Sequence, residues 1–381
     1  MPLSLPRPSG LRCALVRLAV ALAAVTPLAG QTPDPSPTPT PPPPAVESER
    51  KVVIHGYLSQ AFAISDGHQV LGIPSDGTFD YRAAALQFRA IISPKDSFVI
   101  QFSQERLGES PVMEFTDSID LDWVFYERAL GSGTSVRVGR ARVPFGIYNE
   151  IRFVGPLLPF FRAPDVFYPV GGYAFGSING AVISKSLFPT RRFSLDADLY
   201  GGEWSFLQRG VATRVLAKKG LGGQLWLNTP LRGLRFGLGG NRSTWINVVN
   251  ERPGARVAHH RWAASADGSF ERFRLNAEYE RDSATGQDAS AAYVLGSLHI
   301  TDKLNLNLEA SRAHMKLALA AFDEELDRGY AAGLSYAFRP DLVLKVENHW
   351  AKGRRFEEPG VTIFSPPLEA DYLIVSLSTL F

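Results

Sequence analysis

Apolar and polar residues alternate through most of this chain after residue 50. The last segment, 370–381, places Leu373, Val375, Leu377 and Phe381 on one parity. Successive side chains of a strand point to opposite faces, so this segment predicts a strand with one apolar face. An open sheet edge of this kind promotes aggregation, whereas a closed barrel pairs both edges and turns its apolar face to lipid. The pattern therefore predicts a transmembrane β-barrel.

Sixteen segments follow the same alternation. In the clearest of them, 193–200, 272–280, 304–309 and 342–349, charged or amide residues occupy the face opposite the apolar one. A soluble sandwich would rarely place charges on the outer face of strand after strand. We therefore expect an all-β, transmembrane antiparallel β-barrel of about 16 strands. The expected strands lie near 52–64, 80–92, 95–106, 119–130, 133–143, 175–187, 191–202, 220–228, 233–245, 255–267, 270–281, 290–301, 303–314, 329–338, 341–350 and 370–381.

The predicted connections alternate between short turns and longer loops, as in outer-membrane barrels. The short ones carry turn residues, for example Ser93-Pro94 and Gly131-Ser132. An even strand number puts both termini beside the short turns, which predicts that they face the periplasm. The long connections are 65–79, 107–118, 144–174, 203–219, 246–254, 282–289, 315–328 and 351–369.

The longest connection, 144–174, differs from an exposed flexible loop in composition. It contains four prolines after Pro144 and a series of aromatic residues, among them Phe160, Phe161 and Phe167. So much apolar surface needs a wall to pack against, and the lumen is the nearest one. We expect the loop to fold inward and constrict the channel; an outer lid or a subunit contact is the alternative.

The first 50 residues have a different character. Residues 1–30 contain three arginines, no acidic residue and an apolar run, which predicts a cleaved secretory signal peptide. We expect residues 31–50 to form a proline-rich periplasmic linker and residues 51–381 to form the outer-membrane β-barrel domain. The chain has 40 basic and 38 acidic residues; without the three arginines the balance is 37 to 38, so nothing points to nucleic acid. The only cysteine, Cys13, lies in the signal.

One stretch carries a resemblance to a known family. Residues 136–146 read Val-Arg-Val-Gly-Arg-Ala-Arg-Val-Pro-Phe-Gly and are followed by Tyr148-Asn149-Glu150-Ile151-Arg152. This stretch resembles the segment that enters the third loop of Gram-negative porins, most closely the phosphate-selective-porin and DcaP-like groups. The resemblance implies a trimeric channel constricted by this loop, and it implies that Phe381 is the signal read by the barrel-assembly machinery. It also implies lipid and lipopolysaccharide as surroundings.

A water-filled lumen selects solutes by its radius and its charges. We predict inward-facing basic residues opposed by acidic ones, an arrangement that would orient dipolar solutes. Asp120 and Asp122 are predicted inward because they oppose Leu121, Trp123 and Phe125 in the alternation. Arg140 and Arg142 share the apolar parity and lie near the outer rim, unless a bend before Pro144 turns them inward. The candidate pore-lining residues are Arg137, Glu150, Arg152, Arg162, Asp165, Asp120, Asp122, Asp196, Asp198, Arg272 and Arg274.

No catalytic or cofactor motif stands out. The sequence lacks a zinc-protease His-Glu-x-x-His, a phosphate-binding loop, a dinucleotide fingerprint and a nucleophile elbow. His259 and His260 are adjacent on one strand and point to opposite faces, so they do not predict a shared metal. We expect no enzyme activity, no cofactor and no metal, and instead passive diffusion of small hydrophilic solutes, anions included. The alternative is a closed structural or adhesive barrel.

Overall fold

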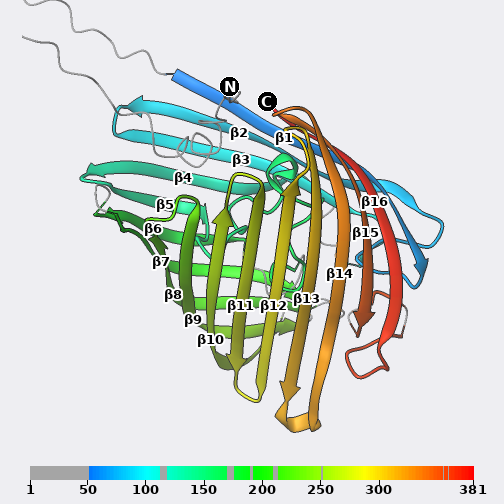
Figure 1. The fold of residues 1–381 in the computed structure, drawn as a ribbon. Coiled ribbons are helices and arrows are strands. Elements are labelled where there is room, and N and C mark those ends of the chain that lie inside the picture. The colour runs from blue at the N-terminus through cyan, green and yellow to red at the C-terminus, as the bar shows by residue number, and fades with distance from the viewer. Residues whose placement is uncertain are drawn as a thin grey trace, which may run out of the picture. The chain divides into compact units, whose positions relative to one another are not determined.

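A computed structural model describes residues 51–111, 118–169, 176–188, 192–208, 213–249, 252–354, 356–358 and 360–381. The predicted signal peptide and linker lie outside these residues. Sixteen antiparallel strands form one closed barrel (Figure 1), which confirms the predicted fold and strand number. The strands are β1 (Lys51–Gly67), β2 (Thr78–Ser93), β3 (Asp96–Leu107), β4 (Asp120–Gly131), β5 (Thr134–Arg142), β6 (Ser177–Leu187), β7 (Ser194–Gln208), β8 (Thr213–Asn228), β9 (Leu234–Val249), β10 (Arg252–Ser269), β11 (Phe273–Ala284), β12 (Gln287–His299), β13 (Leu304–Leu317), β14 (Phe322–Arg339), β15 (Leu342–Gly353) and β16 (Leu368–Leu380).

The barrel closes between its first and last strands. β1 pairs with β16 in a register that runs from Tyr57 opposite Leu380 to Gly67 opposite Ala370. The final residue extends this ladder, because Gly56 N donates to Phe381 O at 2.9 Å and Phe381 N donates to Gly56 O at 3.1 Å. A Cβ at Gly56 would lie 2.2 Å from the Phe381 ring, so a glycine is required where the ring crosses β1.

The two faces of the sheet have opposite character. Outward residues such as Leu238, Leu308 and Leu377 are 58%, 52% and 46% exposed, and they form a continuous apolar band. Inward positions of the strands hold polar groups, including the buried Glu278 on β11 and Lys345 on β15. An apolar outer face with a polar interior is the arrangement that suits lipid outside and water inside. None of the described helical segments is long and apolar enough to cross a membrane.

Four of the predicted long loops are largely strand. β7 and β8 continue to Gln208 and from Thr213, and β9 and β10 continue to Val249 and from Arg252. β11 and β12 leave only 285–286 between them, and β13 and β14 form a tall hairpin that ends in the 3-10 turn η2 (Ala318–Ala320) (Figure 1). These extensions were missed because they project beyond the apolar band. Both of their faces meet water there, so the backbone pairs without an alternation of apolar residues.

A bulge in β4 reverses one predicted face. The β3–β4 register places Gln101 opposite Trp123 but Phe102 opposite Leu121, so Asp122 is the extra residue. A bulge shifts the parity of the residues beyond it. Leu121 faces outward as expected, whereas Phe125 is only 7% exposed and packs inside the barrel, with Trp123 against the same cluster. The outward orientation predicted for Trp123 and Phe125 was therefore wrong.

Candidate functional site: the inward loop and the lumen

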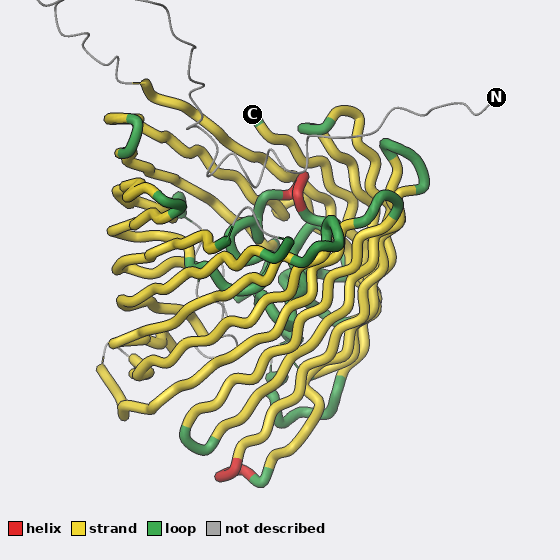
Figure 2. The backbone as a smooth tube through the Cα atoms, turned by 60° about the vertical axis from the view of Figure 1, so that its left-hand side comes forward, coloured by secondary structure: helices red, strands yellow, loops and turns green. Residues whose placement is uncertain are grey.

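The connection after β5 enters the barrel, and Figure 2 shows loop segments inside the ring of strands. Its turn begins at Gly146, which has a φ of 66° that favours glycine. A Cβ at Gly146 would lie 2.3 Å from Tyr168 Oη and 2.8 Å from Glu278 Oε1. The loop backbone at Gly146 therefore passes very close to the inner face of the barrel wall at β11. Gly146 N donates to Gln224 Oε1 at 3.1 Å. The described part of the predicted constriction loop thus lies in the lumen, and residues 170–174 lie outside the described range.

Glu278 on β11 holds the first half of the loop. Its carboxylate accepts the backbone N–H of Ile147 at 3.0 Å and the hydroxyl of Tyr293 at 2.6 Å, and it also accepts from Tyr168 and Ser265. Hydrogen bonds to a charged group in a buried setting contribute about 1.5–3 kcal/mol each. This buried carboxylate therefore holds the loop to β11, and among the described residues no basic side chain forms an ion pair with it.

Lys345 and Glu347 on β15 hold the second half. Lys345 Nζ donates to Gly155 O and Phe160 O, both at 2.7 Å. Glu347 accepts the backbone N–H of Phe161 at 2.9 Å. The turn η1 (Gly155–Leu157) packs so closely that a Cβ at Gly155 would meet Ser59 Oγ at 2.1 Å. The loop therefore spans the lumen from the β8–β11 wall to the β15–β1 wall.

Apolar packing adds to these polar anchors. Phe145, Phe160 and Phe167 of the loop are at most 3% exposed and belong to one cluster with aromatic residues of the wall. Burial of a phenylalanine side chain is worth about 1.5–3 kcal/mol. Glycines in the wall make room for the wall aromatics: a Cβ at Gly222 would lie 2.5 Å from the Tyr200 ring. The aromatic content that predicted a packed loop is thereby accounted for.

Arg152, a predicted pore-lining residue, is a brace within the loop. It is 5% exposed, and its Nη2 donates to Tyr168 O at 3.0 Å and to Pro169 O at 2.9 Å. Burial, together with the nearby Arg142, lowers the pKa of Arg152 to about 10, so the side chain is still charged at neutral pH. Because both Nη2 hydrogen bonds end on loop carbonyls, this arginine ties the two arms of the loop to each other.

Arg137 and Glu150 form the most solvent-accessible charged pair of the loop. Arg137 faces inward on β5, and its Nη1 lies 3.3 Å from Glu150 Oε1. The Glu150 side chain is 50% exposed and that of Arg137 is 16% exposed. Glu150 is therefore the more solvent-accessible member of the pair.

Arg162 and Asp165 lie together near the loop tip. Arg162 Nη2 is 3.3 Å from Asp165 Oδ1, and its Nη1 donates to Tyr81 Oη at 3.2 Å. Arg162 is thus held between the loop and β2. Burial alone would lower its pKa, but the charges of Tyr81, Asp165 and Glu105 outweigh this and raise the pKa above its ordinary value.

Asp122 is engaged with Arg142 rather than with the open lumen. Arg142 Nη2 donates to Asp122 Oδ2 at 2.7 Å, and both residues are buried. Arg140 Nε donates to the backbone carbonyl of Asp122 at 2.9 Å. Gly139, with a φ of 132°, precedes this change of direction. The alternative in which a bend turns Arg142 inward is the one that the structure adopts, whereas Asp120 is exposed at the start of β4.

The remaining predicted residues lie near the turn end of the barrel. Asp196 accepts from Ser186 Oγ at 2.7 Å, and Asp198 accepts from Ser184 Oγ at 2.5 Å. Arg274 faces inward 4.0 Å from Asp267, but Arg272 is exposed in the turn before β11 and does not line the wall. The expectation of a basic wall opposite an acidic wall is not met, because Arg137, Arg142 and Arg162 each have an acidic partner.

None of the three anchoring residues, Glu278, Lys345 and Glu347, was predicted to hold the loop, although Glu278 was expected among the inward-facing acidic residues. Glu278 and Lys345 each carry the inward parity of their strand, so their direction is readable from the sequence. Their partners are backbone atoms of a loop more than a hundred residues away, which no local pattern identifies. Within the described residues, no group of three or more histidine, cysteine or acidic side chains is placed to hold a metal ion.

Similarity to known proteins is confined to the fold. No protein-family model and no curated protein matches the sequence. The barrel is similar to Salmonella typhi OmpF in complex with daunomycin (12% identity, TM-score 0.60), covering 87% of this chain and 98% of that one. It is also similar to an anion-selective porin from Comamonas acidovorans (11% identity, TM-score 0.56, 87% and 100% covered) and to the trimer form of OmpT, an outer membrane protein from Vibrio cholerae (11%, 0.54, 87% and 99%). The chain therefore has the fold of outer-membrane porins.

Proposed function

We propose that this protein is a passive diffusion channel for small hydrophilic solutes in a bacterial outer membrane. A barrel of sixteen strands is wide enough to enclose an aqueous channel. The single observation that carries the proposal is the inward loop, which spans the lumen and is anchored on both sides. Such a loop narrows a wide barrel to a selective aperture, and it leaves Arg137 and Glu150 in contact with solvent.

Location and orientation follow from the two ends of the barrel. The apolar band fits a bilayer, and both termini lie beside the short turns, which in such barrels face the periplasm. A cleaved signal in residues 1–30 would deliver the chain, and Phe381 would be read by the assembly machinery. The trimer form of the OmpT neighbour supports a homotrimer here, to be measured by sedimentation of the detergent-solubilised protein.

Planar-bilayer recording tests the channel against its alternative. Stable current steps from the refolded protein would establish an open pore without catalysis. Silence from a barrel shown to be folded by its heat-dependent electrophoretic mobility would favour the closed structural or adhesive reading. The polar inner face favours the channel, because a purely structural barrel gains nothing from solvent-accessible charges in its lumen. The finer resemblance to phosphate-selective and DcaP-like porins stays a prediction.

Ion selectivity should respond in opposite directions to the two members of the exposed pair. We expect Arg137→Gln to lower the anion-to-cation permeability ratio, because it leaves the Glu150 charge unopposed. We expect Glu150→Gln to raise the ratio, because it leaves the Arg137 charge unopposed. The reversal potential in a salt gradient measures both. Equal reversal potentials for the two variants would show that neither side chain contacts the ion path.

A row of basic side chains follows the outer face just beyond the apolar band. Like charges oppose each other directly in the register: Arg242 faces His260, and Arg328 faces both Arg312 and Lys352. Such pairs are destabilising unless anions lie between them. Among the described residues, Glu325 pairs with both Arg312 and Arg328, and Glu369 pairs with Lys352. We infer that lipopolysaccharide phosphates occupy the remaining positions.

The lipid contact can be measured as lipopolysaccharide retained after detergent purification. The double variant Arg242→Gln, Arg328→Gln should retain several-fold less than the native chain. Arg339→Gln, which changes an exposed arginine at the opposite end of the barrel (side chain 65% exposed), is the control and should retain the native amount. Equal retention by all three proteins would rule the basic row out as the contact.

A further inference from the structure

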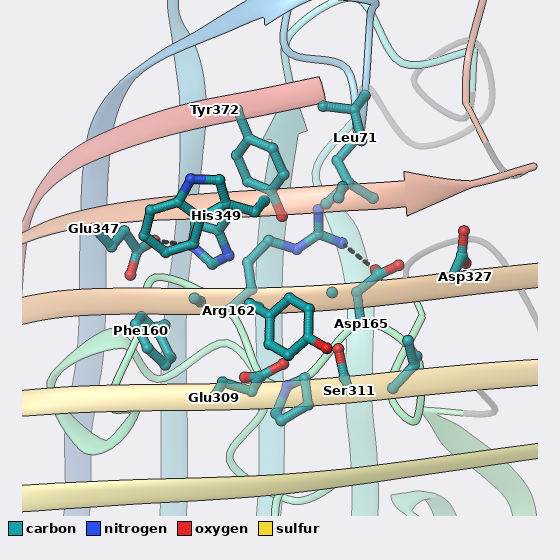
Figure 3. Close-up of a pocket in the computed structure, with 18 of the residues that line it drawn as sticks. Leu71, Phe160, Arg162, Asp165, Glu309, Ser311, Asp327, Glu347, His349 and Tyr372 are labelled. Carbon is teal, nitrogen blue, oxygen red and sulfur yellow. Dashed lines mark hydrogen bonds and ion pairs between the residues drawn. The ribbon is translucent and has the colours of Figure 1, made fainter. Parts of the chain in front are cut away.

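A cavity lies beside the tip of the inward loop (Figure 3). It is bounded by loop residues 160–166 and by the inner face of β13 to β16, and it encloses about 830 Å³ of empty space, part of it open solvent. Leu71 and Phe356, from the β1–β2 and β15–β16 connections, complete its lining. The cavity therefore lies toward the end of the barrel opposite the termini, where a solute from outside would meet the loop.

Small residues on β14 create this space. The inward positions of that strand are Gly329, Ala331 and Gly333, and a Cβ at Gly333 would already meet Glu347 Cβ at 2.9 Å. Ala331 lies opposite Glu309 on one side and His349 on the other. The side of the cavity formed by β14 therefore carries only short side chains, and the longer side chains of β13 and β15 project on either side of it.

Acidic residues outnumber basic ones around the cavity: Asp165, Glu309, Asp327 and Glu347 line it, against Arg162 and Arg328. Arg162 is the inward-held basic side chain among them (Figure 3). Arg162 is already paired with Asp165. Within the described residues, no basic side chain forms an ion pair with Glu309. Glu309 is half-buried, so a ligand that brings positive charge would form an ion pair with it.

An aromatic wall adjoins these carboxylates. The His349 ring stacks on Tyr372 with 4.5 Å between centroids and 4° between planes, and the Phe160 ring lies 5.4 Å from His349. His349 Nε2 lies 3.5 Å from Glu347 Oε1. Aromatic faces attract cations and pack against hydrocarbon chains. The wall thus suits an organic cation better than a bare metal ion.

We propose that this cavity binds small organic cations that carry an ammonium or guanidinium group. The cationic group takes a place beside Glu309 and Glu347, and the hydrocarbon part of the ligand lies against Phe160 and His349. The site would retain such solutes on their way past the loop. Passage rests on the proposed channel function, whereas binding does not depend on it.

The test uses the full mature barrel in planar bilayers with L-lysinamide as the probe, added at the long-loop side. We expect concentration-dependent blocking of the current, and Glu309→Gln should raise the half-blocking concentration about tenfold or more, which corresponds to about 1.4 kcal/mol. Glu127→Gln, a lumen carboxylate on β4 that does not line the cavity, is the matched control and should shift it less than twofold. Neutral xylitol should not block.

Two results would overturn the proposal: the same block in the native chain and in Glu309→Gln, or a block by xylitol equal to that by lysinamide, which would indicate a sugar-type site. An absence of current steps without any probe would instead contradict the channel function. In that case calorimetric titration of lysinamide into the detergent-purified native and Glu309→Gln barrels still decides whether the cavity binds cations.

Discussion

Removal of residues 150–170, with a short Gly-Ser linker joining the ends, should raise single-channel conductance several-fold. The described part of this segment crosses the lumen from the β11 anchor to the β15 anchor, so its side chains occupy cross-section that ions would otherwise use. The deletion leaves Glu278, Lys345 and Glu347 in contact with water and not in apolar surroundings. Because water can hydrogen-bond to these groups, we expect the barrel still to close. Conductance in molar salt measures the effect.

The matched control shortens a connection that lies outside the lumen. Replacing residues 318–321 at the tip of the β13–β14 hairpin with Asn-Gly should leave conductance unchanged, because η2 lies at the end of a projecting hairpin. Heat-dependent electrophoretic mobility checks that both variants are folded. Unchanged conductance in the loop deletion would contradict the constriction role. Current in the deletion but none in the native chain would mean that the loop closes the barrel.

Lys345→Met should loosen the loop without unfolding the barrel. Lys345 is 1% exposed and donates to the carbonyls of Gly155 and Phe160. Methionine keeps much of the volume but leaves two buried carbonyls without these donors, at about 1–3 kcal/mol each. A change of about 3 kcal/mol corresponds to roughly a hundredfold increase in the population of open loop.

Two measurements separate loosening of the loop from loss of the barrel. Lys345→Met should show larger current fluctuations and faster proteolytic cleavage within 150–169, while the heat-dependent mobility shift of the barrel stays at its native temperature. Lys352→Met on the same strand is the control, since its ammonium is 55% exposed and faces outward to Glu369. Cleavage of Lys345→Met at the native rate would show that the lysine does not hold the loop.

The alternation of side chains was enough to predict the barrel because it depends on local geometry alone. Side chains of a strand that separates lipid from water must alternate every two residues, and segments such as 193–200, 272–280, 304–309 and 342–349 show this clearly. The prediction failed where that constraint ends. The parts of β7 to β14 that project beyond the apolar band, at the end of the barrel with the long connections, meet water on both faces. At the β4 bulge one extra residue, Asp122, reversed the direction of Trp123 and Phe125.

The sequence predicted that the inward loop is packed, but not which residues anchor it. Its prolines and aromatic residues indicated a packed segment, since such a composition cannot remain exposed at low cost. Its anchors depend on residues far along the chain, such as Glu278 for Ile147 and Lys345 for Gly155. A sequence records which side chains point inward, but not which loop atom each will meet after the barrel closes.

The sequence by itself determined the barrel, its strand number, the lipid-facing side chains and the presence of a packed third loop, because each follows from the local alternation or composition of residues. Only the tertiary structure decided that Arg152 braces the loop, that Asp122 pairs with Arg142, and that small residues of β14 leave a carboxylate-lined cavity. Those features arise only when residues far apart in the sequence come together in the closed barrel. Ion pairing, burial and cavity shape depend on these contacts between distant residues, which no local sequence pattern specifies.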